Sequence, residues 1–167
     1  MIDRRELTLD NSNNLKSAKL SSSISQFYSI PSISTNITFA NYVGNELSTS
    51  YSLNFTRFLF LKRIEIGNNC FQHVREFVID GLPSLESVKI GEWCFRIDKE
   101  ERNDGLCRIT NCPNLRQLEI GDESFYDFKS FELSNLNSIQ FIKFGEYCFR
   151  HADCSLKGEW KERKKEM

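Results

Sequence analysis

The chain contains 167 residues, which is enough for one domain with a sizeable buried core. Apolar residues make up 40% of it and charged residues 27%, a composition typical of globular rather than disordered proteins. Lys and Arg total 22 against 23 Asp and Glu, and this near balance argues against nucleic acid or an anionic membrane as the partner.

The sequence carries neither a secretory signal nor a membrane span. Residues Met1–Glu6 are mostly charged and lack the apolar run of a signal peptide. The longest strongly apolar patch, Phe58–Leu61, is far shorter than the roughly 18 residues that a membrane helix needs. Together with cysteines at expected core positions, described below, these features favour a cytoplasmic location.

An internal repeat dominates the chain. Four segments share the pattern L-x-x-[IVL]-x-[IF]-G-x-x-[CS]-F, and they begin at Leu61, Leu85, Leu115 and Ile139. Their glycines are spaced by 24, 30 and 24 residues, at Gly67, Gly91, Gly121 and Gly145. The alternating apolar positions 4 and 6 predict a half-buried strand, the Gly is expected to permit a turn, and the Phe is expected to point inward.

The N-terminal third, residues 1–50, reads as degenerate copies of this repeat. Leu7–Asp10 matches the second half of a unit, so we expect the array to open in mid-repeat. An uncapped end of this kind favours self-association or fraying. Leu15 and Ile37 begin two weaker copies of the first half. The serine-rich segment Ser21–Ser34 is either a degenerate repeat, which we favour, or a flexible linker.

A second shared piece comes before each of the four segments. It alternates apolar residues over a few positions and predicts a second short strand or extended segment, beginning at Leu53, Phe77, Cys107 and Phe131. The six extra residues of the longest unit lie around Ile97–Asn103, in a charged run expected at a solvent-facing corner. Residues 157–167 form a charged C-terminal tail or a short cap.

The L-x-x-L-x-L core of these segments resembles that of leucine-rich-repeat proteins, and it is matched at Leu15, Ile37, Leu61, Leu85, Leu115 and Ile139. The I-G-x-x-C-F element is similar to the I-G-x-x-A-F corner of the bacterial-surface and treponemal subclass. The resemblance covers residues 6 to 157. It departs from the common repeat in the asparagine after the strand, which is present only at Asn69, so we expect the corner to be stabilised by stacking.

The repeat and this resemblance predict a mainly β fold with little helix. Residues 1–156 would form a right-handed solenoid with a parallel β-ladder, in about five to six coils of about 24 residues. The family implies recognition of proteins or glycans on the repeat surface. It supplies no shared catalytic residues.

The six cysteines invite a metal or disulfide hypothesis. Three of them share one repeat column with Ser124, and two more replace apolar residues of the second piece, at Cys70, Cys94, Cys148, Cys107 and Cys112. Because cysteine acts there as a compact hydrophobe, we expect all six thiols to be free. Cys148-x-x-His151-x-x-Cys154 has metal-like spacing, but it offers only three ligands, so no metal or other cofactor is expected.

Positions 3 and 5 of the predicted strands form the most informative surface. Position 3 reads Arg63, Ser87, Gln117 and Phe141, and position 5 reads Glu65, Lys89, Glu119 and Lys143. The alternating charges either set the register through cross-strand pairs or belong to a binding face. An outward Phe141 is either an anchor for a partner or is covered by the C-terminal tail with Trp160. The carboxylates Glu92, Asp122 and Glu146 read as a solvated acidic edge.

The sequence points to binding rather than catalysis. It contains no P-loop, G-x-G-x-x-G or G-x-S-x-G motif, and its two histidines leave little scope for acid–base chemistry, so we do not expect an enzyme. We expect recognition of a protein or peptide through the stacked strand face. The alternative is a structural or adhesive repeat array, a fragment of a longer solenoid. An exposed patch of Phe141, Trp93 and Tyr147 would favour recognition, and paired charges alone would favour the array.

Overall fold

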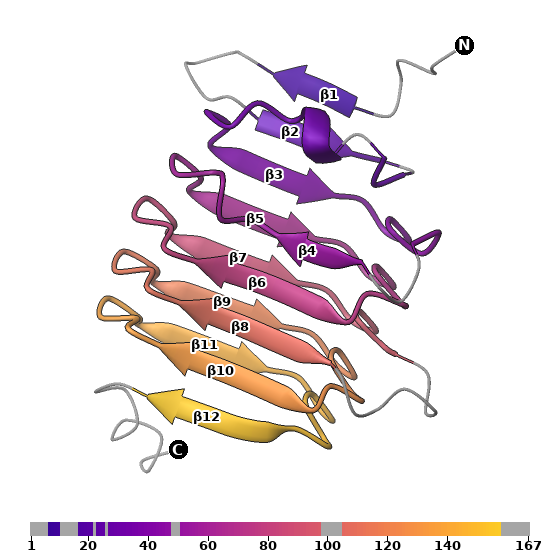
Figure 1. Ribbon diagram of the computed structural model, residues 1–167, viewed down its shortest axis with the longest axis vertical. Helices are drawn as coiled ribbons and strands as arrows, with labels where there is room; N and C mark the ends of the chain where they lie inside the picture. The colour runs from indigo at the N-terminus through magenta and orange to yellow at the C-terminus, as the bar shows by residue number, and fades with distance from the viewer. Residues whose placement is uncertain are drawn as a thin grey trace.

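A computed structural model describes residues 7–10, 17–21, 23–25, 27–47, 51–97 and 105–157. Most of the charged insertion and the C-terminal tail therefore lie outside the described residues. Within them the protein is mainly β, as expected, and its only helix is a short 3-10 turn, η2 (Phe27–Ser29). The strands form two sheets, which Figure 1 shows as two facing layers.

We name the seven-stranded sheet A and the five-stranded sheet B. Sheet A contains, in spatial order, β1 (Leu7–Asp10), β2 (Ser17–Leu20), β3 (Asn36–Phe39), β5 (Arg63–Ile66), β7 (Ser87–Ile90), β9 (Gln117–Ile120) and β11 (Phe141–Phe144). Sheet B contains β4 (Ser52–Asn54), β6 (Glu76–Asp80), β8 (Leu106–Thr110), β10 (Ser130–Ser134) and β12 (Asp153–Lys157). From β3 onward the chain alternates between the sheets, and the neighbouring strands in each sheet run parallel.

The register of both sheets follows the repeat. In sheet A the position-4 residues align directly, at Ile64, Val88, Leu118 and Ile142. In sheet B the second piece aligns in the same way, at Leu53, Phe77, Cys107 and Phe131. The predicted alignment of these two sets is confirmed.

The core lies between the sheets, and most of its largest fully buried side chains are phenylalanines. The repeat column Phe71, Phe95, Phe125 and Phe149 is buried, as the sequence predicts. Its rings stack on one another, with centroids 5.2, 4.5 and 4.9 Å apart. Stacking of this kind adds about 0.5–1.5 kcal/mol per pair beyond the burial of apolar area. The column therefore ties successive repeats together along the length of the core.

The first strand departs from the prediction. β1 pairs antiparallel with β2 in sheet A, with Leu7 opposite Leu20 and Asp10 opposite Ser17, rather than parallel in sheet B. The connection between the two strands, residues 11–16, is long enough for a hairpin. It is shorter than the dozen or so residues that a parallel crossover needs. The interpretation of Leu7–Asp10 as the second half of a repeat is therefore wrong.

The third strand of sheet A lies three residues out of the predicted frame. Ile37 pairs with Ala18 and Ile64, so it occupies position 4 and not position 1. Position 1 is taken by Ser34, which is fully buried where Leu61 stands in the next repeat. Because a serine stands here where the regular repeats have a leucine or isoleucine, the sequence pattern did not reveal this frame.

The serine-rich segment before β3 packs into the core, as expected of a degenerate repeat rather than a linker. Ile24, Phe27 and Ile30 are buried. The Arg57 guanidinium donates to the carbonyl oxygens of Phe27 and Ile30 at 2.7 and 3.0 Å, and it lies 4.1 Å from the Phe58 ring centroid. In its described part the segment has η2 where the later repeats have a strand of sheet B (Figure 1).

The repeat glycines are required for a different reason from the one we expected. A Cβ on Gly121 would lie 2.6 Å from the carbonyl carbon of Gly91, and a Cβ on Gly91 would lie 2.7 Å from that of Gly67. The left-handed φ angles fall instead on later residues of the corner, such as Trp93 at 60° and Phe95 at 55°. The glycines therefore permit close approach between successive corners rather than an unusual turn conformation.

This distinction can be tested with two substitutions. Gly121→Ala forces a methyl group against the backbone of the neighbouring corner, and we expect it to lower the free energy of unfolding by about 1–3 kcal/mol. Gly81→Asn should cost far less, because a Cβ at Gly81 meets no atom within 4 Å. Its counterparts Asn111 and Asn135 already adopt φ near 54°. Urea unfolding of both variants measures the difference, and equal losses would refute the close-approach explanation.

The phenylalanine column leads to a second testable prediction. Phe95→Ala removes a fully buried ring that stacks on Phe71 and Phe125, so we expect a loss of about 3–5 kcal/mol in the free energy of unfolding. Phe141→Ala is the matched control, because that ring is 48% exposed. It should cost less than about 1 kcal/mol. Comparable losses in urea unfolding would contradict this assignment of the core.

Candidate functional site

The sheet register brings all eight predicted face residues together on the outer surface of sheet A. Two rows run across β5, β7, β9 and β11. The charged row consists of Glu65, Lys89, Glu119 and Lys143. The lateral row consists of Arg63, Ser87, Gln117 and Phe141. Because side chains alternate along a strand, both rows point away from the core.

The charges of the charged row are not paired with one another. The ion pairs found among the described residues lie elsewhere: Arg96 with Glu123 at 3.5 Å and Arg108 with Glu132 at 3.1 Å. Within the face, the Gln117 amide donates to the Glu119 carboxylate along β9. The expected cross-strand contacts are therefore not formed as ion pairs in the described part of the chain.

The three aromatic residues that we expected to form a patch, Phe141, Trp93 and Tyr147, lie in two different places. Phe141 begins β11 on the strand face and is 48% exposed. Tyr147 follows the other end of β11, and Trp93 occupies the same corner position two repeats earlier. The Arg96 guanidinium lies 4.6 Å from the Trp93 ring centroid, and Arg150 lies 5.4 Å from that of Tyr147. The three aromatic residues are exposed, but they do not form a single patch. The tail residue that we expected to cover Phe141 lies outside the described residues.

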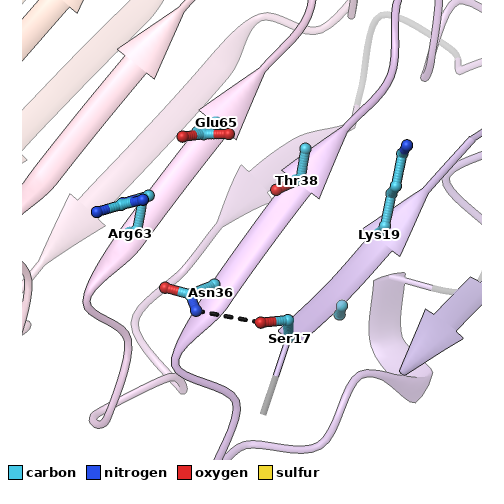
Figure 2. A pocket seen from close by; sticks show the side chains of 7 residues that line it. Ser17, Lys19, Asn36, Thr38, Arg63 and Glu65 are labelled. Carbon is cyan, nitrogen blue, oxygen red and sulfur yellow. Dashed lines mark hydrogen bonds between the residues drawn. The ribbon is translucent and has the colours of Figure 1, made fainter. Parts of the chain in front are cut away.

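Sheet A also has a hollow of about 390 Å³ on its outer face, over β2, β3 and β5 (Figure 2). The short side chains Asn36 and Thr38 form its floor, between Lys19 on one side and Glu65 on the other. The Asn36 amide donates to the Ser17 hydroxyl at 3.1 Å. The hollow exists because Thr38 is short between Lys19 and Glu65, and because Ser17 and Asn36 are short beside Arg63.

The N-terminal members of the face were not recognised from the sequence. Lys19 continues the charged row, and Thr38 lies between it and Glu65. The three-residue error in the frame at Ile37 concealed this continuity. The signal that could have corrected it is Ile37-x-Phe39, which repeats the alternation of β5 in the correct frame.

Contrary to our expectation of stacking without side-chain hydrogen bonds, a ladder of asparagine and aspartate is present, one position before the column of Asn69. The Asn68 carboxamide accepts the N–H of Glu92 at 3.0 Å, and the Asp122 carboxylate accepts the N–H of Glu146 at 2.9 Å. The corner is thus stabilised by side-chain hydrogen bonds as well as by stacking. Asp122, which we read as part of a solvated acidic edge, has a structural role.

The column of cysteine and serine donates to backbone carbonyl groups. Cys94 and Cys148 donate through Sγ to the carbonyl oxygens of Gly67 and Gly121 at 3.0 and 2.9 Å, and Ser124 Oγ donates to that of Gly91 at 2.8 Å. Burial raises the pKa of Cys148, which keeps its thiol protonated. Five cysteines are free, and the side chain of the sixth lies outside the described residues.

The residues with metal-like spacing have other partners. Cys148 uses its thiol as a donor to a carbonyl group, and the His151 ring packs edge-on against Tyr126 with centroids 5.5 Å apart. The third member, Cys154, is not among the described side chains. Among those that are described, no group of three His, Cys, Asp or Glu residues is arranged to hold a metal ion.

A carboxylate at the end of β6 is held by the next repeat. Asp80 accepts hydrogen bonds from the Thr110 hydroxyl and the Asn111 amide, both at 2.7 Å, and these bonds lower the pKa of Asp80. Asn111 in turn accepts a hydrogen bond from the Asn135 amide at 2.6 Å. These bonds form a second polar ladder, which runs across the carboxyl ends of β6, β8 and β10 in sheet B.

This ladder predicts a pH dependence. Because folding lowers the pKa of Asp80, its contribution to stability is present above the unfolded-state pKa of about 3.9 and is lost as the pH falls through the folded value. We expect Asp80→Asn to be less stable than the wild type at pH 7 and to approach it near or below about pH 3. Urea unfolding at both pH values tests this, and a difference that does not depend on pH would contradict it.

Comparisons with known proteins identify no relative. No family model, no curated protein and no solved structure matches this chain. In its described part the protein has no helix that is long and apolar enough to cross a membrane. The outer face of sheet A, which consists of the charged row, the lateral row and the adjoining hollow, is the candidate functional site.

Proposed function

We propose that the two sheets belong to a right-handed, leucine-rich-repeat-like solenoid whose outer face on sheet A recognises a protein or peptide. The alternation of the chain between two parallel sheets supports the architecture. The glycine spacing of 24, 30 and 24 residues also supports it, because each unit then contributes one strand to each sheet. In this proposal the chain is a binding module and not an enzyme.

One observation carries the proposal of recognition: the four charges of the charged row are aligned but not paired with each other. A row of aligned charges that form no ion pairs with one another adds little to the stability of the fold. It does leave charges available to a partner. Phe141, 48% exposed at the end of the lateral row, adds an aromatic side chain of the kind that anchors interfaces.

The alternative function, a structural or adhesive array, predicts a different arrangement on this face. In such an array the charges would form ion pairs across neighbouring strands, and these pairs would set the register. Neither ion pair among the described residues involves the charged row. We therefore propose recognition in preference to the array.

A peptide-display selection tests the proposal. Peptides enriched on the wild-type protein should bind a variant with Lys89→Glu and Glu119→Lys at least about tenfold more weakly, because the charged row then reads acid, acid, base, base and no longer alternates in either direction. The net charge of this variant is unchanged. Isothermal titration of the selected peptides measures the affinities.

The matched control reverses the charges on the other sheet. Arg108 and Glu132 pair on neighbouring strands of sheet B, and Arg108→Glu with Glu132→Lys leaves the outer face of sheet A intact. We expect this control to bind the selected peptides as the wild type does. If no peptide is enriched, or if the selected peptides bind the charged-row variant equally well, the proposed function is wrong.

A further inference from the structure

The charged row has a defined period. Its charges alternate in sign over four adjacent strands of sheet A, from Glu65 on β5 to Lys143 on β11. Neighbouring strands lie about 4.8 Å apart, so the four charges recur at that interval and span about 14 Å. These strands run side by side in a regular stack in Figure 1. On β3 the alternation ends, because Thr38 occupies the next place.

An α-helix laid across the strands matches this period. With a rise of 1.5 Å per residue, residues i, i+3, i+7 and i+10 lie at about 0, 4.5, 10.5 and 15 Å along the helix axis. The strands lie at about 0, 4.8, 9.6 and 14.4 Å, so each helical residue falls within about 1 Å of a strand. Residues at these spacings also share one side of the helix.

An extended peptide does not match the period. Side chains on one side of a β-strand recur at about 6.7 Å, so the second would already be about 2 Å beyond its strand and the third about 4 Å beyond. A strand laid across the row could oppose at most one or two of the four charges in register. The spacing therefore distinguishes a helical partner from an extended one.

We infer that the partner recognised by this face is an α-helix that crosses β5, β7, β9 and β11 and carries basic, acidic, basic and acidic residues at spacings of three, four and three. The inference rests on the proposed function and specifies its partner. Each helical charge meets the opposite charge of the row, from Glu65 to Lys143. The spacing pattern is symmetrical, but the order of the charges is not, so a helix that reads basic, acidic, basic, acidic from its N-terminus must run from β5 to β11.

The lateral row adds a second contact to the same helix. Phe141 precedes Lys143 by two residues on β11 and points to the same side of the sheet. A helix about 10 Å wide covers both rows. An apolar side chain beside the last charge of the helix therefore meets the exposed Phe141 ring, and this contact marks one end of the site.

Two helical peptides of identical composition test the inference. Both are alanine-based and carry two Lys and two Glu at spacings of three, four and three, with a leucine beside the last charge. In the alternating peptide the order is Lys, Glu, Lys, Glu, and in the block peptide it is Lys, Lys, Glu, Glu. In either chain direction the block peptide places two like-charge contacts against the row. Circular dichroism establishes that both peptides are helical.

A protein variant provides the reciprocal half of the test. Lys89→Glu with Glu119→Lys leaves the net charge unchanged and converts the row to acid, acid, base, base. At low ionic strength, we expect the wild type to bind the alternating peptide about tenfold more tightly than the block peptide. We expect the variant to show the reverse preference, and both preferences to shrink as salt is added.

The outcomes separate this inference from the proposed function. If the wild type binds the two peptides equally or binds neither, or if the variant does not reverse the preference, the inference is overturned. Peptides selected by display that bind the charged row without a helical charge pattern would preserve the proposed function while refuting the helical partner. Failure of the display selection itself would refute the proposed function.

Discussion

Hydrogen bonding between parallel strands holds successive repeats about 4.8 Å apart, and most features of the molecule follow from that spacing. Equivalent residues lie directly beside one another, so every repeat position must accept a near copy of itself as its neighbour. Phenylalanine meets this condition by stacking, with the rings of Phe95 and Phe125 4.5 Å apart. Glycine meets it by lacking a Cβ, as at Gly121 against Gly91.

The same spacing explains why chemically different residues share a column. Cys94 and Ser124 stand in equivalent places, and both donate to the carbonyl group of the preceding corner. The column therefore requires a small side chain with one donor, and either a thiol or a hydroxyl satisfies it. Asn68 and Asp122 likewise share the role of accepting a backbone N–H from the next repeat. In each case the geometry selects a hydrogen-bonding role and not a residue type.

The N-terminal end is stabilised in another way. Ser34 is buried in a leucine column, and its hydroxyl has no hydrogen-bond partner among the described residues, which lowers the stability that this repeat gains from burial. Arg57 compensates by binding the backbone around η2 and covering the Phe58 ring. β1 then adds to sheet A in the antiparallel direction. Sheet A thus extends beyond the region in which the sequence repeat is regular.

On the outer face the interstrand spacing sets the period of the exposed charges. Packing in the core requires the strands to lie at a constant interval, so the exterior side chains recur at the same interval. The charges of Glu65, Lys89, Glu119 and Lys143 are therefore presented with a period that a helix matches and an extended chain does not. The hollow over β3 interrupts this pattern, because Asn36 and Thr38 are short.

The sequence by itself determined the register from β5 to β11 and the membership of both face rows. Four copies of one pattern can bury their Leu, Ile and Phe columns together in only one alignment, and strand alternation then assigns Glu65 and Phe141 to the outside. Only the tertiary structure decided the direction of β1, because a Leu-x-Leu alternation is the same in a parallel and an antiparallel strand. It also decided the reason for the glycines, which depends on contacts between residues of neighbouring repeats that a pattern read along the chain does not contain.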